Sequence, residues 1–297
     1  MEPRILEGVS RRDFIRLGAA TALGAAGCRK AAEPPGTGRT SEVPAPVPPA
    51  PPKPRLAVQL GVQSYSFRKF KFLEAVRMTS DLGLPHIEPF PGHFRMNSPP
   101  ERLAEVQKAL AASNVTMNAY GVCGMGTDEG RNRAVFDFCK KLDISAISAN
   151  PKPNSLDLLD KLVEEYDVRI AIHNHGPRAT WRTADQMLQA IQDHHPHIGV
   201  CLDTGHLMRA GDDPVAAVGK LGQRLHGFHL KDVNEQNHDV VMGTGRLDFL
   251  ALFRAMAEVG FQGFVSLEYE IHADDPVPGL TQSVAHCRSV LQQVSPS

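Results

Sequence analysis

Four short apolar segments in the second half of the chain each end in a side chain that commonly binds metal ions. These side chains are His173, Asp203, His229 and Glu268. Successive members lie 30, 26 and 39 residues apart, and one strand, one helix and two loops have about that length in a barrel of eight such units and roughly 250 residues. Because these barrels keep their active sites at the C-terminal ends of the strands, the spacing predicts one metal site built from four strands.

Strand-like and helix-like segments alternate from about residue 60 to the end of the chain. Most candidate strands are apolar without period-two alternation, as expected for parallel strands buried on both faces. They are residues 60–64, 86–90, 116–121, 145–149, 169–173, 199–203, 225–230 and 263–268. Amphipathic stretches lie between them; Gly83 and Gly260 are suited to end helices, and Asp248 is suited to begin one. Eight strand–helix units predict an α/β fold, a single (β/α)8 barrel with parallel strands.

An open, doubly wound sheet is the competing architecture. A dinucleotide-binding sheet of that kind carries a glycine-rich phosphate loop after its first strand. The segment Gly61-Val62-Gln63-Ser64 holds one glycine where that loop needs three, and Gly243-Thr244-Gly245 follows no clear strand. The sequence therefore favours the barrel, and it contains no recognisable glycine loop for a phosphate group.

Residues 1–28 have the pattern of an export signal. Ser10-Arg11-Arg12-Asp13-Phe14-Ile15 is a twin-arginine motif, and the mildly apolar stretch 17–27 after it is too short to span a bilayer as a mature helix. Ala25-Ala26-Gly27-Cys28 resembles a lipoprotein cleavage box with Cys28 as the lipidated residue. The prediction is export by the twin-arginine route to the periplasm, with membrane contact through the lipid anchor alone. A plain basic helix and cleavage without a lipid are the alternatives.

Residues 29–54 are predicted to be a linker. The stretch 31–54 contains nine prolines and almost no bulky apolar side chains. Such a composition cannot form a core, and a proline-rich chain is stiff and extended. Residues 55–297 are then the folded barrel domain, with no second linker to divide it.

Charge and cysteine content argue against several classes of protein. The chain has 32 basic and 33 acidic residues and a formal net charge of −1. No basic block follows the signal, so nucleic acid is not expected as a partner. The cysteines after Cys28 are Cys123, Cys139, Cys201 and Cys287. None forms a Cys-x-x-Cys pair, which argues against a zinc knot or a thioredoxin motif and favours buried free thiols.

The four strand-end side chains supply two imidazole nitrogens and two carboxylates. This mixture suits one divalent Mn, Zn, Co or Fe ion better than Mg or Ca. A catalytic metal ion also needs open positions for substrate oxygens beside its fixed protein donors. A lone histidine at a strand end is more often a hydrogen-bonded core residue, so it is the joint appearance of all four side chains that predicts the site.

Several motifs resemble the xylose-isomerase-like TIM-barrel family, which includes sugar-phosphate isomerases, ketose epimerases, inosose dehydratase and enzymes of the endonuclease IV type. The resemblance covers about residues 61–291 and rests on the segments 201–206, 229–232, 241–249 and 267–269. It implies a small-molecule carbohydrate as the substrate, with Asp203, His229 and Glu268 as the metal ligands of strands six, seven and eight. It leaves open whether the chain forms a homo-oligomer.

Side chains beside the four proposed ligands are candidates for substrate contact and proton transfer. His206 matches a position that usually faces the substrate in the sugar enzymes. Lys231 and His175 are expected to contact substrate oxygens or to carry protons.

Three further residues each allow a functional and a structural role. Glu88 matches an acidic residue at the end of strand two, where it either contacts the substrate or forms a buried salt bridge. His93 and Trp181 lie in loops on the active-site side. Ordinary loop packing is the expectation for these two, and closure over the substrate is the alternative.

One departure from the family pattern changes the expected chemistry. Many epimerases of this family have a glutamate as the strand-five ligand, which also serves as one of two opposed bases, whereas this chain has His173. An imidazole that binds a metal through one nitrogen has lost the lone pair that a base needs. Glu268 therefore remains as the candidate catalytic base. The candidate second proton carriers are His175, His206 and Lys231.

The sequence predicts a divalent-metal-dependent sugar isomerase or epimerase that acts on a sugar or keto-sugar through an enediolate-type intermediate. A metal-dependent lyase or dehydratase acting on 3-keto-glycosides is the first alternative, and the strand-five histidine and the predicted export favour it. A non-catalytic sugar-binding lipoprotein is the second. A nuclease of the endonuclease IV type is disfavoured because it needs further histidines on strands two and three, and residues 115–121 contain none.

Overall fold

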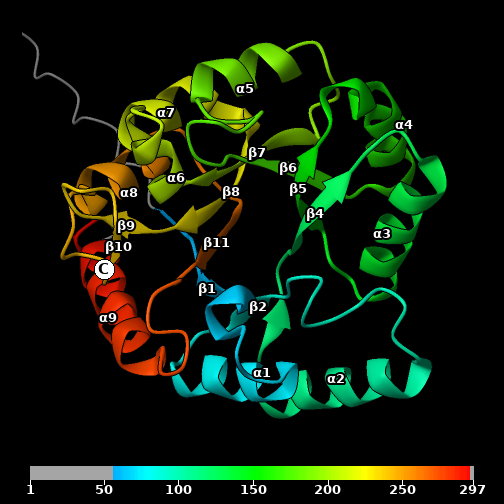
Figure 1. Ribbon diagram of the computed structural model, residues 1–297, viewed down its shortest axis with the longest axis horizontal. Coiled ribbons are helices and arrows are strands. Elements are labelled where there is room, and N and C mark those ends of the chain that lie inside the picture. Colours follow the sequence, from blue (N-terminus) through cyan, green and yellow to red (C-terminus); the bar gives the residue numbers. More distant parts are fainter. Residues whose placement is uncertain (1–55, 295–297) are drawn as a thin grey trace, which may run out of the picture. The chain divides into compact units, whose positions relative to one another are not determined.

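A curled parallel sheet surrounded by helices makes up the part of the chain that the computed structural model describes, residues 56–294 (Figure 1). The predicted export motif, the cleavage box with Cys28 and the linker 29–54 lie outside the described residues. Within the described residues, no helix is both long enough and apolar enough to cross a membrane.

The sheet of the described residues has nine strands, and each neighbouring pair is parallel. In spatial order they are β3 (Thr116–Met117), β2 (His86–Glu88), β1 (Leu60–Gln63), β11 (Phe264–Leu267), β8 (Leu225–Leu230), β7 (Ile198–Asp203), β6 (Arg169–His173), β5 (Ala146–Pro151) and β4 (Tyr120–Met125). The two edge strands β3 and β4 are consecutive pieces of one segment, which therefore joins both edges of the sheet. This gives the eight strand positions of a (β/α)8 barrel, as the sequence predicts.

Helices lie around the outside of this sheet (Figure 1). The longer ones are α1 (Phe72–Asp81), α2 (Pro100–Ala112), α3 (Glu129–Lys141), α4 (Leu156–Tyr166), α5 (Ala184–Ile191), α7 (Pro214–Leu221), α8 (Phe249–Glu258) and α9 (Val277–Val294). The shorter elements are η1 (Ser64–Phe67), η2 (Pro153–Ser155), α6 (Thr204–Arg209), η3 (Gly222–Arg224) and the hairpin strands β9 (Asp232–Val233) and β10 (Asp239–Val240).

Local signals in the sequence set the ends of two helices. The side chain of Asp248 accepts a hydrogen bond from Ala251 N at 2.9 Å and caps the start of α8. Gly83 and Gly260 follow α1 and α8 with φ angles of +68° and +65°, a conformation that glycine adopts without the strain other residues meet. The three predictions for these positions are confirmed.

The third strand differs from its prediction. The sequence indicates one continuous strand over residues 116–121, whereas the structure has β3 and β4 with Asn118 and Ala119 between them. β4 then runs on to Met125 beside β5. The backbones approach closely at Gly121, where a Cβ atom would lie 2.1 Å from the carbonyl oxygen of Ser148, so this contact requires a residue without a side chain.

Small side chains and one aromatic ring fill the barrel below the C-terminal rim. Ala119, Ala146, Ala171 and Cys201 form a cluster of their own with Phe264. A Cβ atom at Gly227 would lie 2.3 Å from the Phe264 ring, so the glycine makes room for the aromatic side chain. The ring centroid of His229 lies 6.4 Å from that of Phe264, and the site therefore rests on a packed floor.

The cysteines of the described residues are free and buried, as the sequence predicts; they are Cys123, Cys139, Cys201 and Cys287. Burial raises the pKa of the Cys201 thiol to about 11 and that of Cys287 to about 12. These thiols therefore stay protonated and behave as small apolar side chains.

Candidate metal centre

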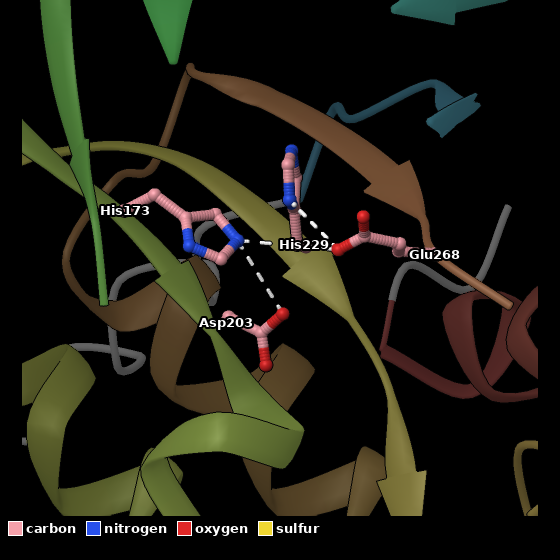
Figure 2. A group of neighbouring side chains, drawn as sticks. All are labelled: His173, Asp203, His229 and Glu268. Atoms are coloured by element: carbon pink, nitrogen blue, oxygen red, sulfur yellow. Dashed lines mark hydrogen bonds and ion pairs between the residues drawn. The ribbon is translucent and has the colours of Figure 1, made fainter. Parts of the chain in front are cut away.

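The four strand-end side chains meet at the C-terminal end of the barrel (Figure 2). His173 and Asp203 end β6 and β7, His229 is the last residue but one of β8, and Glu268 directly follows β11. All four are buried, and one donor atom of each lies within 4.8 Å of the others. The structure therefore brings the four proposed metal ligands together.

Asp203 is fixed so that one carboxylate oxygen faces the cluster. Its Oδ1 accepts a hydrogen bond from His206 N (2.6 Å) and caps α6, while the Asn174 amide bonds the Asp203 backbone N and O at 2.8 and 2.9 Å. Oδ2 receives no hydrogen bond, although Lys231 Nζ lies 3.1 Å away as an ion pair. Burial alone would raise the pKa of Asp203, but Lys231 and His173 hold it well below its ordinary value. The carboxylate is therefore ionised.

His173 is buried without a hydrogen bond at either ring nitrogen. Its Nε2 lies 3.4 Å from Asp203 Oδ2 and 3.9 Å from Glu268 Oε2 (Figure 2). Burial lowers the pKa of His173 more than these carboxylates raise it, so the imidazole is neutral and keeps a lone pair. A buried polar nitrogen without a partner is destabilising, and a metal ion would supply the partner.

His229 is oriented by a second buried carboxylate. Its Nε2 hydrogen-bonds Glu88 Oε2 at 2.9 Å, and its Nδ1 lies 3.1 Å from Glu268 Oε2. Glu88 is fully buried and also accepts hydrogen bonds from the hydroxyls of Ser148 and Ser266. These contacts occupy both oxygens of Glu88. The structure therefore shows the predicted buried ion pair, and Glu88 is not among the residues that line the cavity described below.

Replacing Glu88 with Gln is expected to weaken divalent metal binding by about 10- to 100-fold, the usual effect of losing a partner that orients a metal-binding histidine. Burial would lower the pKa of His229, but Cys201, Glu88 and Glu268 raise it well above its ordinary value. Gln keeps the size of the side chain and removes the negative charge behind the ring, so His229 becomes a poorer donor. Competition with a chelator of known affinity measures the change.

The matched control for that experiment is Ser148→Ala. It removes a neutral hydroxyl from the same hydrogen-bond network and leaves the pair between Glu88 and His229 in place, so its effect on metal affinity should be much smaller. Equal effects of the two substitutions would contradict an orienting role for the charge of Glu88.

Lys231 adds a buried cation to the cluster. Its Nζ lies 3.1 Å from Asp203 Oδ2 and 3.0 Å from Glu268 Oε2, and it hydrogen-bonds Glu270 Oε1. Burial would lower the pKa of Lys231, but the three carboxylates raise it well above its ordinary value. Lys231 is therefore a permanent ammonium group, suited to donate a hydrogen bond and unsuited to act as a base.

The donor set fits one divalent ion. Two carboxylates and two imidazoles converge, and the buried Nε2 of His173 and Oδ2 of Asp203 receive no hydrogen bond. Burial would raise the pKa of Glu268, but Lys231 and His229 hold it far below its ordinary value. Ionised carboxylates and the neutral ring of His173 are the protonation states that metal binding needs, whereas His229, whose pKa is raised, would release a proton when the ion binds. Mixed nitrogen and oxygen donors favour a transition metal or zinc over Mg or Ca.

A cavity of about 330 Å³ opens at this cluster. It is lined by Gln63, Tyr65, Phe90, Pro91, Gly121, Val122, His173, His175, His206, Lys231, Glu268 and Glu270. The ring centroids of His175 and His206 lie 5.3 Å apart, and burial lowers the pKa of both. Two neutral imidazoles and one ammonium group therefore border the metal centre, at the positions proposed for substrate contact and proton transfer.

The two loop residues, His93 and Trp181, are not among the residues that line the cavity. The ring of His93 packs against Phe90 with centroids 4.5 Å apart, and its Nε2 is 3.0 Å from the carbonyl oxygen of Phe70. Trp181 is buried and donates from Nε1 to the carbonyl oxygen of Pro151 at 2.8 Å. Both residues have the packing role that the sequence favoured.

Seven lining residues were not among the predicted site residues: Gln63, Tyr65, Phe90, Pro91, Gly121, Val122 and Glu270. A signal existed for Glu270, since it lies two residues beyond Glu268 and a strand repeats its side-chain direction every two residues. No comparable signal existed for Tyr65, because an aromatic residue beside a strand is usually part of the core.

The glycines of the segment 241–249 have a structural role. Asp232 accepts hydrogen bonds from the backbone N of Gly243, Gly245 and Leu247 at 2.9, 2.8 and 3.1 Å. A Cβ atom at Gly245 would lie 2.3 Å from Asp232 Oδ1, so the loop needs glycine there. The backbone N–H groups of these residues therefore donate hydrogen bonds to a protein carboxylate and not to a phosphate.

A family model described as a xylose isomerase-like TIM barrel matches residues 154–290. This range includes all four members of the metal cluster. This match, together with the barrel architecture and the geometry of the cluster, supports the assignment of the chain to the xylose isomerase-like TIM-barrel family.

Named relatives have low sequence identity to this chain. The inosose dehydratase of Lacticaseibacillus casei is 27% identical over 134 residues, which cover 39% of this chain and 45% of that protein; the chain thus spans about half the length of the curated relatives it matches. Two solved structures share the fold with a TM-score of 0.65. The IolI protein with a bound zinc atom is 18% identical, covering 81% of this chain and 100% of that one. The 3-keto-D-glucoside 4-epimerase of E. coli is 20% identical, covering 78% and 99%.

Proposed function

We propose that this protein is a divalent-metal-dependent sugar isomerase or epimerase that acts on a sugar or keto-sugar through an enediolate-type intermediate. The observation that carries the proposal is the cluster of His173, Asp203, His229 and Glu268 at the C-terminal end of the barrel. Two of its members, His173 and Glu268, line a cavity, and two of its buried donor atoms lack hydrogen bonds. The relatives' names, an inosose dehydratase and a 3-keto-D-glucoside 4-epimerase, support a carbohydrate substrate, and the zinc atom of the IolI protein supports a metal.

Different side chains of the cavity have different roles in acid–base chemistry. A bound metal ion would polarise the substrate carbonyl and stabilise the negative charge of the enediolate. Glu268 is ionised and lines the cavity, so it can take the proton from the carbon next to the carbonyl. Lys231 holds its proton and can donate a hydrogen bond to a substrate oxygen. His175 and His206 are neutral and can receive or return a proton on the side of β6 and β7.

A metal-dependent lyase or dehydratase is the second candidate, and two features favour it. His173 occupies the position where a two-base epimerase would have a glutamate, and the carboxylate of Glu268 lies 3.0 Å from the ammonium of Lys231. In a β-elimination the base takes the proton next to the carbonyl, a carbon–carbon double bond forms, and the carbon–oxygen bond breaks. An acid then protonates the leaving oxygen to give water or an alcohol. Glu268 could serve as the base and then return that proton to the leaving oxygen, while the Lys231 ammonium holds the oxygen by a hydrogen bond.

Proton NMR in D2O with the metal-loaded protein tests the proposal. The substrates are free ketoses and methyl 3-keto-glucopyranoside. Deuterium next to the carbonyl together with a new isomer is the result expected of an isomerase or epimerase, and release of methanol is the result expected of a lyase. Absence of both exchange and product from all substrates, in protein that holds a full equivalent of metal, would sink the proposed function.

We also infer that the barrel works outside the cytoplasm, anchored by a lipid on Cys28. The support is the order of the twin-arginine motif, the apolar stretch and the cleavage box in residues 10–28. Mass spectrometry of the mature protein should find Cys28 as the first residue, carrying acyl chains. A chain that still begins at Met1 would contradict this location.

A further inference from the structure

Two aromatic side chains form a corner of the cavity that the acid–base chemistry does not use. Tyr65 comes from η1 after β1, and Phe90 follows β2; both line the cavity. Their ring centroids lie 5.3 Å apart and the ring planes meet at 85°, so the two rings form a right-angled pair of flat apolar surfaces. Tyr65 is 36% exposed, one of the few large apolar side chains of the described residues that remain open to solvent.

Polar contacts restrain the two segments that carry these aromatic rings. The guanidinium of Arg68 lies 4.8 Å from the centroid of the Tyr65 ring and donates to the carbonyl oxygen of Glu270 at 2.6 Å. The hydroxyl of Ser64 accepts a hydrogen bond from Phe90 N at 2.9 Å, which ties the two segments together. Both aromatic rings are therefore set in place before a ligand arrives, which reduces the entropy cost of binding.

The aromatic rings behind Phe90 continue into the core. Successive ring centroids lie 4.5 to 5.9 Å apart through the series Phe90, His93, Phe72, Phe94, Phe138 and Tyr120. A packed series of this kind resists displacement of its outermost ring.

The topology places this corner across the mouth from the strand ends that carry the histidines. Eight strand positions close the barrel, so β1 lies opposite β6, and β2 lies opposite β7. Tyr65 is thus across from His173 and His175, and Phe90 is across from Asp203. A ligand in the cavity lies between a flat apolar corner on one side and polar, metal-binding groups on the other.

We propose that the corner formed by Tyr65 and Phe90 selects a substrate in closed-ring form, a pyranoside or cyclic polyol ketone, by stacking on the apolar face of its ring. A six-membered sugar ring in a chair presents axial C–H groups on its faces and hydroxyls around its edge. One aromatic ring then lies under a face, the other bounds the edge, and the hydroxyls and ring carbonyl turn toward Lys231 and the metal centre. A cavity of about 330 Å³ is at the small end of ligand sites, which suits one such ring.

This inference rests on the proposed function and narrows it. An open-chain sugar offers no flat apolar face and gains nothing from the corner. Aldose–ketose interconversion requires the open chain, whereas epimerisation next to a ring ketone and β-elimination from a ring ketone do not. The corner therefore favours the last two reactions over the first.

Equilibrium binding of two unreactive ligands tests the inference. Methyl β-D-glucopyranoside has the closed ring, and D-glucitol has the corresponding open chain. Titration followed by NMR should give the ring compound the higher affinity, and saturation transfer from aromatic protons should be strongest at its axial protons. Tyr65→Leu and Phe90→Leu should each weaken binding of the ring compound by roughly 2- to 10-fold and leave binding of D-glucitol unchanged.

Met96→Leu is the matched control, because Met96 is exposed and does not line the cavity; it should alter neither affinity. Thermal unfolding of each variant separates loss of binding from loss of fold. Equal binding of the two ligands, or equal losses for both in the leucine variants, would overturn the inference. Because neither ligand reacts, these outcomes do not depend on turnover, and the D2O experiment alone decides the proposed function.

Discussion

Replacing Asp203 with Asn is expected to abolish metal binding, so that the purified variant holds less than roughly a tenth of an equivalent where the parent protein holds one. Asp203 supplies an ionised oxygen, Oδ2, that receives no hydrogen bond and lies 3.4 Å from Nε2 of His173. Asn replaces this anionic donor with a neutral amide. Loss of a group that only orients a ligand costs about 10- to 100-fold in affinity, and loss of a ligand should cost more.

The substitution is chosen to keep the fold. The other oxygen of Asp203 caps α6 by accepting from His206 N, and Asn is as good a cap as Asp. Lys231 keeps its ion pairs with Glu268 and Glu270. The unfolding temperature of the metal-free variant should therefore stay close to that of the metal-free parent, while the metal content falls.

Asp213→Asn is the matched control. Asp213 also caps a helix, α7, by accepting from Val215 N at 2.9 Å, and it takes no part in the cluster. It should leave the metal content at one equivalent by elemental analysis. If the Asp203 variant held as much metal as the Asp213 variant, Asp203 would not be a ligand.

The spacing of the strand ends made the metal cluster predictable from the sequence. Each parallel strand buries an apolar run, and the polar residue that ends it must lie at the rim. His173, Asp203 and Glu268 could be placed in one site from their intervals alone. The ends of helices at Gly83 and Gly260 were also predictable, because a glycine that ends a helix is a local signal in the sequence.

The sequence was less informative about how close each side chain lies to the C-terminal rim of the barrel. Pairs such as His173 with His175, or His229 with Lys231, are two residues apart and point to the same side of the strand. In each pair the first residue belongs to the cluster, and the second residue lines the cavity. Glu268 and Glu270 follow the same rule, which would have identified Glu270.

The rule also explains why Glu88 was ambiguous. Glu88 and Phe90 lie on the same side of one chain segment, and the structure places Glu88 under the cluster and Phe90 at the cavity wall. Whether the first or the second member reaches the rim depends on the stagger between neighbouring strands. That stagger is set by packing across the whole barrel, and a single sequence does not reveal it.

Replacing Lys231 with Met is expected to separate catalysis from metal binding: activity should fall by roughly 100- to 10,000-fold, while the metal content stays at one equivalent. Lys231 is 2% exposed, and its ammonium contacts the carboxylates of Asp203, Glu268 and Glu270. Met fills similar volume without charge. The loss removes the hydrogen-bond donor proposed to act on the substrate, and it also removes a positive charge that repels the metal ion, so metal affinity should hold or increase.

The same substitution should destabilise the metal-free protein. It leaves the buried carboxylates of Asp203 and Glu268 without their cation, and breaking a buried ion pair in this way costs on the order of 3–5 kcal/mol. A bound divalent ion supplies the missing positive charge. The stabilisation that metal addition brings in urea unfolding should therefore be larger for the variant than for the parent.

Lys220→Met is the control for the loss of a lysine charge, since Lys220 pairs with Asp185 at 2.8 Å on the surface. It should leave activity, metal content and the response of stability to metal unchanged, because exposed ion pairs contribute little. A Lys231 variant that lost its metal together with its activity would show that the ammonium holds the ligands in place. A variant that kept full activity would remove Lys231 from the catalytic scheme and leave the metal ion and the two neutral histidines to stabilise the enediolate.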